Sequence, residues 1–244
     1  MSSDTSFSRT LSIAKIWARI CRHRSLSLAL LPGRVRANSD LKRIERLRNE
    51  TEGDLDHNPT SAAKYADYAL WIPFNVARIG TLSLQNSAPL RILDIGCGPG
   101  YFLATARACG HDVHGVDAPE TVLSAVEKRV YSEMLAALSL SPRVSPLLVE
   151  RFVPMPATHR DLDLITAFWI CFNRHRQKDE WGAAEWRFFV DNALSQLRAG
   201  GVLHLELNAH PERYGSLQWY DAETLDFFRS AGSVQRNIIR IRKE

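Results

Sequence analysis

Three closely spaced glycines follow a short apolar run that carries one carboxylate. Gly96, Gly98 and Gly100 form a G-x-G-x-G pattern, and Asp94 stands just before it. Glycines in a turn between a strand and a helix let backbone amides approach a ligand with no Cβ in the way. A dinucleotide-binding turn would need its third glycine at position 101, which is Tyr101. Because a carboxylate repels a pyrophosphate, Asp94 favours a ligand with an ammonium and a sulfonium group.

A second carboxylate stands where a bound ribose would need it. Asp117 ends the β-rich run 112–117, well beyond the glycines. At the end of the second strand of such a fold, an acid accepts hydrogen bonds from ribose hydroxyls. The loop and Asp117 together predict a ligand with a ribose and a cationic end. A nicotinamide-dependent oxidoreductase is disfavoured by Tyr101 and Asp94.

Strands and helices are expected to alternate around these residues. The pattern predicts strands over 90–94, 112–117, 144–152, 162–170, 202–207 and 238–242, and helices over 101–109, 119–138, 180–197 and 222–230. This alternation is typical of an α/β fold with a doubly wound, mostly parallel sheet of six to seven strands. Few residues remain after Gly232, so we expect one good final strand and a stub before it. Ligands of such a sheet bind outside the carboxyl ends of its strands.

The basic charge of the chain is concentrated at its N-terminus. Residues 1–50 carry 11 Lys and Arg against 4 Asp and Glu, whereas the other 194 residues carry 20 against 23. A nucleic-acid-binding body would show its own basic face, so nucleic acid is disfavoured as a partner. Within residues 10–24, apolar side chains fall near one helical face and basic ones lie off it. This segment is either a helix docked on its own domain, a contact with a membrane surface or partner, or an organellar targeting signal.

Further helices are expected before the glycine loop. Pro32-Gly33 should end the first segment, a helix should follow over 40–48, and the acidic stretch 50–56 indicates a polar connection. Thr60 can cap a helix through about residue 80, which Pro73 must kink or divide. We therefore divide the chain into a basic arm over 1–59, a helical cap segment over 60–88 and a ligand-binding domain over 89–244.

Cysteine usage points to a reducing environment. The four cysteines are scattered and form no zinc-binding spacing, so we predict no disulfide framework, no metal site and a cytoplasmic protein. No run of about 18 apolar residues is present, which predicts no membrane span. Cys97, flanked by glycines, should pack rather than react, and Cys171 should be a buried, inert thiol. The aromatic residues of the expected helix 180–197 should lie mostly in the core.

The run Ile92-Leu93-Asp94-Ile95-Gly96-Cys97-Gly98-Pro99-Gly100, followed by Gly115-Val116-Asp117, resembles the nucleotide-binding core of class I S-adenosylmethionine-dependent methyltransferases. Leu197 to Leu203 resembles the turn before that family's fifth strand. The resemblance implies a Rossmann-like fold and S-adenosyl-L-methionine as cofactor. It also implies these cofactor-binding residues: Asp94, Gly96, Cys97, Gly98 and Gly100 in the loop, Asp117 at the ribose, Ala118 beside the adenine, Glu150 or the backbone of Phe152 at the adenine amine, and Phe168 in the wall toward the acceptor.

The same resemblance implies in-line transfer of a methyl group. The stretch Cys171-Phe172-Asn173-Arg174 lacks the Asp/Asn-Pro-Pro-aromatic run of base-methylating enzymes, which argues against nucleic-acid bases as acceptors. We expect a small molecule or a glycan or lipid precursor, in a pocket capped by the N-terminal helices. If the acceptor needs a general base, His175 is the first candidate and His210 the second. The alternative is a non-catalytic S-adenosylmethionine-binding protein whose basic arm contacts a membrane or partner.

Overall fold

The computed structural model describes residues 26–58, 61–174, 179–208 and 220–244. The chain divides into two units that interleave along the sequence. One contains the residues up to Pro89 together with Gly98–Asp112 and Glu120–Val144, and the other contains Leu90–Cys97, Val113–Pro119 and Ser145–Glu244. The first unit is helical, and the second holds the sheet strands almost entirely. Each unit is described separately below.

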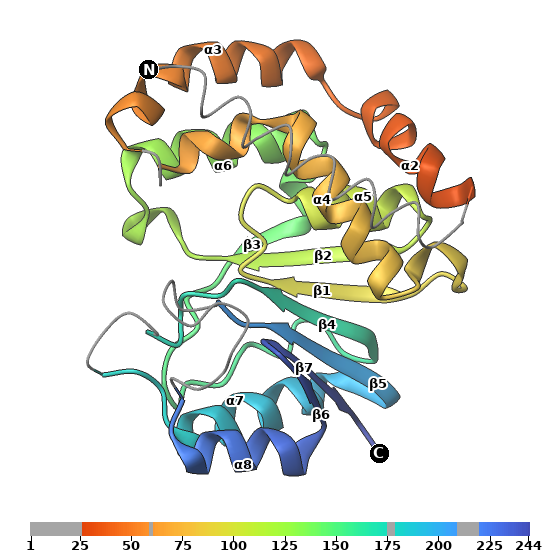
Figure 1. Ribbon diagram of the computed structural model, residues 1–244, viewed down its shortest axis with the longest axis vertical. Coiled ribbons are helices and arrows are strands. Elements are labelled where there is room, and N and C mark those ends of the chain that lie inside the picture. Colours follow the sequence, from red (N-terminus) through yellow and green to blue (C-terminus); the bar gives the residue numbers. More distant parts are fainter. Residues whose placement is uncertain (1–25, 59–60, 175–178, 209–219) are drawn as a thin grey trace. The chain divides into compact units, whose positions relative to one another are not determined.

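A seven-stranded sheet forms the centre of the second unit, in the order β3-β2-β1-β4-β5-β7-β6 (Figure 1). The strands are β1 Arg91–Ile95, β2 Asp112–Asp117, β3 Val144–Pro146, β4 Leu162–Phe168, β5 Leu197–Glu206, β6 Ser233–Gln235 and β7 Ile238–Arg242. β1 pairs with β4 and β4 with β5 in parallel, while β7 runs antiparallel to both β5 and β6. The strand order and the alternation with helices give a Rossmann-like α/β fold, as the sequence predicted.

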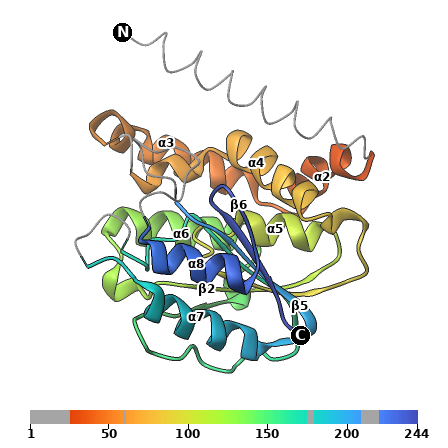
Figure 2. The same cartoon turned by 60° about the horizontal axis from the view of Figure 1, so that its bottom comes forward.

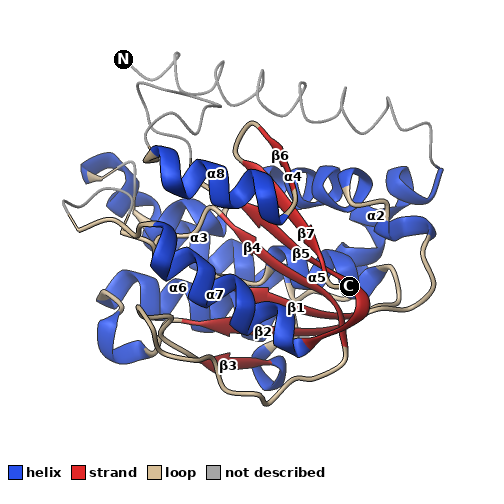
Figure 3. Ribbon diagram, turned by 90° about the horizontal axis from the view of Figure 1, so that it is seen from below, coloured by secondary structure: helices blue, strands red, loops and turns tan. Residues whose placement is uncertain are grey.

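Two helices cover one face of this sheet. They are α7 Ala183–Gln196 and α8 Ala222–Ala231, which lie next to each other against β4, β5 and β7 (Figures 2 and 3). Their aromatic side chains interlock, because Trp186 is fully buried with ring centroids 5.1 Å from Phe228 and 5.9 Å from Phe189. The expected placement of these aromatic residues in the core is confirmed. An anchored helix layer of this kind holds the carboxyl ends of the strands in fixed positions.

The first unit consists of helices from both halves of the chain. It contains α2 Leu26–Ala37, α3 Leu41–His57, η1 Ala62–Ala66, α4 Tyr68–Thr81, η2 Leu84–Asn86, α5 Tyr101–Ala108, η3 Glu120–Val122, α6 Ala125–Ala137 and η4 Ser141–Arg143. The guanidinium of Arg43 on α3 donates to both carboxylate oxygens of Glu133 on α6, at 2.6 and 3.0 Å. The Tyr101 hydroxyl on α5 donates to the carbonyl oxygen of Tyr65, at 2.7 Å. Helices distant in sequence are thus joined by polar contacts.

Several N-terminal boundaries differ from the sequence prediction. α2 continues through Pro32 and Gly33 because Leu28, Leu31 and Val35 form one buried face of it. α3 includes the acidic stretch 50–56, which we had predicted to be a connection, and Asp40 caps its first turn. The helix predicted from residue 60 is divided at Asp67, which caps α4, and α4 then runs through Pro73. In α2 tertiary burial outweighs the local preference, whereas an aspartate at the N-cap sets where α3 and α4 begin.

The strand limits differ mainly at β3 and β5. β3 ends at Pro146, which has no backbone N–H to continue the ladder, although we had predicted a strand to residue 152. β5 begins at Leu197 and includes Gly200 and Gly201. A Cβ on Gly201 would lie 2.9 Å from the carbonyl oxygen of Leu162, so the absent side chain lets β4 approach. The predicted final strand 238–242 and the stub before it are confirmed as β7 and β6.

Two N-terminal predictions fall outside the described residues. They are the amphipathic segment 10–24 and the helix cap at Thr60. Among the helices that the structure does describe, none is long and apolar enough to cross a membrane.

Candidate functional site

Asp94 is held rigidly near the carboxyl end of β1. Its side chain is 3% exposed, and its Cα pairs with that of Thr166 on β4. The Thr166 hydroxyl donates to Asp94 Oδ1 at 2.7 Å. A hydrogen bond to the charged form favours the carboxylate and fixes its direction. The neighbouring strand therefore prepares this anionic group.

The start of the glycine loop is hydrogen-bonded to the backbone of β2. The amides of Gly96 and Cys97 both donate to the carbonyl oxygen of Val116, at 2.8 and 3.2 Å. Gly96 has a φ of 70°, and a Cβ there would meet no atom within 4 Å. The space beside Gly96 is open, and only a residue without a side chain adopts this backbone at little cost. Gly96 thus leaves room for a ligand to approach the main chain.

Asp117 is the last residue of β2 and directly follows Val116. Its Oδ1 accepts a hydrogen bond from the amide of Ala118, and its carbonyl oxygen accepts one from the amide of Leu147, both at 2.7 Å. These bonds orient the carboxylate and fix the start of the stretch that follows β3. The structure therefore places Asp117 and Ala118 together at the carboxyl end of β2.

The two carboxylates share a neighbour in the Cys97 thiol. Burial raises the pKa of Cys97 well above its ordinary value, and the charges of Asp117 and Asp94 raise it further. A protonated thiol is a poor nucleophile, and Cys97 is buried, which supports packing rather than reaction. Because both carboxylates act on Cys97, the charges of Asp94 and Asp117 lie close to the glycine loop. Two negative charges there favour a cationic ligand.

The stretch after β3 carries the two predicted adenine contacts, Glu150 and Phe152. Phe152 is 54% exposed, has a φ of 55° and packs edge-on against Phe188 of α7, with ring centroids 5.7 Å apart. Glu150 is also exposed, and its carbonyl oxygen accepts a hydrogen bond from Val153 at 3.4 Å. One hydrogen bond between this stretch and the site joins the amide of Leu147 to the carbonyl oxygen of Asp117, and it does not involve Glu150 or Phe152. The roles of these two residues at the adenine therefore stay predictions.

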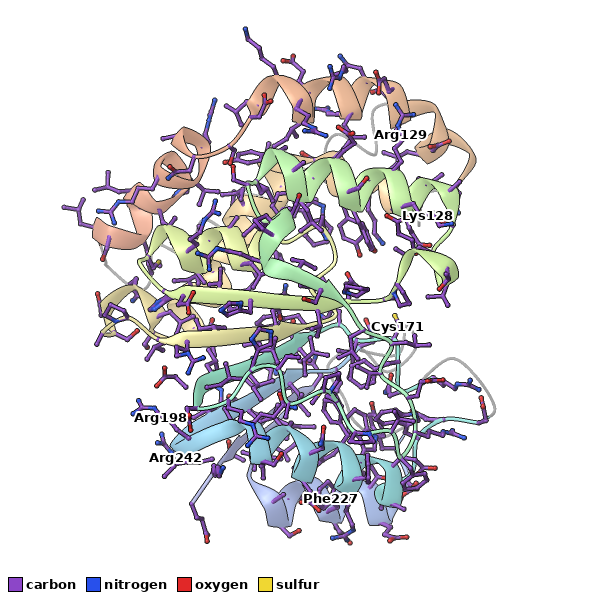
Figure 4. The ribbon with its side chains drawn as sticks, turned by 180° about the vertical axis from the view of Figure 1, so that it is seen from behind. Lys128, Arg129, Cys171, Arg198, Phe227 and Arg242 are labelled. Carbon is purple, nitrogen blue, oxygen red and sulfur yellow. The ribbon has the colours of Figure 1, made fainter. Side chains whose placement is uncertain are left out.

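Phe168 and Cys171 mark the edge of the sheet beyond β4. The Phe168 ring packs on His204 of β5, with centroids 5.6 Å apart. Cys171 is exposed, and Figure 4 shows it at the opposite end of the strands from Arg198 and Arg242. Our prediction of a buried Cys171 is wrong, because the residue is exposed although its neighbour Ile170 is buried. The two predicted bases, His175 and His210, lie outside the described residues.

A polar cluster that we did not predict, formed by Asn173, Tyr220 and Glu180, follows the carboxyl end of β4. Asn173 Nδ2 donates to the Tyr220 hydroxyl at 2.9 Å, and both side chains are buried. Burial, followed by the charge of Asp221, raises the pKa of Glu180 to about 7. Asn173 and Tyr220 lie 47 residues apart in the sequence, so no short motif links them. Only the position of Asn173 after a strand hinted that this region matters.

One family model matches most of this chain. A family model described as a methyltransferase domain matches residues 65–220. No curated protein matches the chain. Among solved structures, an S-adenosylmethionine-bound amino pentose methyltransferase from Micromonospora echinaspora is 22% identical, with a TM-score of 0.42 over 60% of this chain and 54% of that chain. The chain thus spans about half the length of that protein. An S-adenosylmethionine-dependent methyltransferase from Clostridium acetobutylicum is 18% identical, with a TM-score of 0.41 over 66% of this chain and 57% of that chain.

Proposed function

This chain belongs to the methyltransferase-domain family, and we propose that it transfers the methyl group of S-adenosyl-L-methionine to a small molecule or to a glycan or lipid precursor. The observation that carries the proposal is the buried Asp94 carboxylate, fixed by Thr166 at the start of the glycine loop. With Asp117 it supplies two anionic acceptors next to a main chain that a ligand can approach closely. This set of groups fits a nucleoside with a cationic tail and does not fit a pyrophosphate.

Each residue of this set has a binding role. S-Adenosyl-L-methionine, when bound, supplies an electrophilic methyl group on a sulfonium. Asp94 would accept hydrogen bonds from the loop or from the ammonium of the bound cofactor, and Asp117 would accept them from the ribose hydroxyls. Gly96 lets the backbone lie against the nucleoside. Because the donor is already reactive, the protein mainly has to orient the acceptor in line with it and exclude water.

The acceptor class rests on charge and on the stretch after β4. Beyond residue 50 the chain carries more acidic than basic residues, which disfavours a polyanionic acceptor. In place of the pattern that binds nucleic-acid bases, this chain has Cys171 to Arg174, including a buried Asn173. Phe172, Trp181 and Phe189 form an aromatic cluster there, with Phe172 5.2 Å from each of the other two ring centroids. Trp181 and Phe189 are buried core residues, so this cluster anchors the stretch, and the acceptor class rests on charge and on the missing base-binding pattern.

Isothermal titration with S-adenosyl-L-methionine tests the cofactor site. Asp94→Asn and Asp117→Asn keep the size of each side chain and remove its charge, so we expect about tenfold or greater loss of affinity, in line with the 1.5–3 kcal/mol of a charge-assisted hydrogen bond. Asp191→Asn, on the exposed side of α7, is the matched control and should bind like the wild type. Wild-type protein that releases no heat, or unchanged affinity in both site variants, would contradict the assignment.

A second experiment identifies the acceptor and tests the alternative function. The protein is incubated with methyl-labelled S-adenosyl-L-methionine and the small-molecule and lipid fractions of a cell extract, and labelled products are found by mass spectrometry. Label in either fraction supports the proposal. Binding of the cofactor with no label in any fraction would instead favour a non-catalytic binding protein.

A further inference from the structure

The residues just after β4 are fastened to the carboxyl edge of the sheet. The amide of Trp169 donates to the carbonyl oxygen of Glu206, the last residue of β5, at 2.6 Å. Asn208 Nδ2 donates to the carbonyl oxygen of Ile170, also at 2.6 Å. Both bonds lie just past the ends of two parallel strands. Residues held by this segment therefore lie at the edge where ligands of such a sheet bind.

Asn173 joins two distant parts of the chain at that edge. Its carbonyl oxygen accepts from the amide of Trp181 at 3.1 Å, and its side-chain amide donates to the Tyr220 hydroxyl at 2.9 Å. Asn173 is 1% exposed and Tyr220 is 5% exposed. Because Glu180 precedes Trp181 and Asp221 follows Tyr220, this buried hydrogen-bonded link brings the two carboxylates into one cluster.

The Glu180 carboxylate in this cluster has an oxygen that is not used in a hydrogen bond to the described residues. Its Oε1 is buried and has no hydrogen-bond partner within the described part of the chain. Trp181, next to it in sequence, is buried in the aromatic core of the unit. A half-buried carboxylate with an unused oxygen has acceptor capacity left for a proton from outside the chain.

The charged groups around Glu180 support this role. Burial raises the Glu180 pKa, and Asp221, the N-cap of α8, is the nearby charge that raises it further. Burial likewise raises the pKa of Tyr220, and the charge of Glu180 adds to that shift. Of the cations near Glu180 that the structure describes, Arg174 pairs with Asp179, and Arg151 lies 3.9 Å from Asp179 and from Glu185. A carboxyl group that titrates near neutral pH is matched to general-base catalysis.

We propose that Glu180 is the catalytic base, which removes the proton from a hydroxyl or amine of the methyl acceptor. The inference rests on the proposed function and adds a residue to it. A lone pair of the acceptor oxygen or nitrogen forms the new bond to the methyl carbon, and the electron pair of the broken sulfur–carbon bond stays on sulfur. The acceptor proton moves to the half-buried Glu180 carboxylate, and the resulting carboxylic acid then returns it to water. Asn173 and Tyr220 act as positioning residues, because they hold the segment that carries Glu180.

Rate measurements across pH test this role. Wild type, Glu180→Gln and Glu180→Asp are assayed for methyl transfer from labelled S-adenosyl-L-methionine into the extract fractions that the wild type labels. The matched control is Glu223→Gln, an exposed carboxylate on the first turn of α8. We expect the wild-type rate to rise with an apparent pKa of about 7. Glu180→Gln should lower the rate about 100-fold or more and remove this inflection, Glu180→Asp should retain part of the rate, and Glu223→Gln should match the wild type.

Two further readouts separate this role from a structural one. Glu180→Gln should bind S-adenosyl-L-methionine with wild-type affinity in isothermal titration. Because the folded-state pKa of Glu180 is above its ordinary value of 4.5, the folded state holds an extra proton between the two values. The wild type therefore loses stability as pH rises through this range, and the Gln variant should be the more stable above pH 7 and equal to it below pH 4.5.

Two outcomes would overturn the inference. One is a Glu180→Gln variant with the wild-type rate and pH profile. The other is a variant whose lost rate is matched by lost folding or lost cofactor binding. Absence of transfer by the wild type itself would contradict the proposed function, and with it the inference, whereas transfer that survives Glu180→Gln would refute the inference alone.

Discussion

Thr166→Val tests whether the Asp94 carboxylate is anchored by its neighbouring strand. Valine has nearly the shape of threonine, so the change removes the hydroxyl donor at 2.7 Å without opening a cavity. Both side chains are buried, with exposures of 0% and 3%, so water cannot replace the lost donor. A hydrogen bond to a charged group contributes about 2 kcal/mol, which corresponds to about a 30-fold shift in the unfolding equilibrium. For a chain of this size the melting temperature should fall by about 4 to 8 °C.

The matched control is Thr105→Val on α5. The Thr105 hydroxyl is equally buried and donates at the same 2.7 Å, but its acceptor is the neutral carbonyl oxygen of Tyr101. The expected loss is about 1 kcal/mol or less. Urea unfolding at neutral pH measures both variants against the wild type. Equal losses in the two variants, or no loss in Thr166→Val, would refute the claim that a charged acceptor makes the difference.

Two further predictions concern packing and thiol chemistry. Gly232→Ala would place a Cβ onto the carbonyl oxygen of Arg240, so we expect unfolding in urea to show a loss of about 3 kcal/mol or failure to fold. Gly33→Ala, with no atom within 4 Å of the added Cβ, should leave stability unchanged or slightly higher, and similar losses in both would contradict this reasoning. In the folded protein, alkylation followed by mass spectrometry should modify the exposed Cys171 and spare Cys97, whose burial raises its thiol pKa. Equal labelling of both thiols would show that the glycine loop opens readily.

Sequence reasoning could propose cofactor-binding residues because their signals are local. A strand, a glycine turn and a carboxylate at the end of the next strand can all be recognised within short windows. β2 and β7 begin and end at the predicted residues for the same reason, since apolar alternation and nearby turn residues define both.

The predictions failed where distant parts of the chain decide the structure. α3 continues past residue 50 while its Arg43 pairs with Glu133 on α6, a contact that no local pattern reveals. The link from Asn173 to Tyr220 likewise joins segments 47 residues apart. The raised pKa of Glu180 depends on burial and on Asp221 of another helix, so composition and spacing could not indicate it.

The order of the last two strands has a consequence for hydrogen exchange. β6 lies at the sheet edge and pairs with β7, while β7 pairs with β5 from Val202 to Glu206. When β7 separates from β5, β6 must leave with it, so the hairpin opens as one cooperative unit. Amides of β6 should then become deuterated at least as readily as those of β7, because β6 can also separate from β7 alone. The β5 amides that face them should gain exposure in the same event, while the pairing of β5 with β4 stays intact.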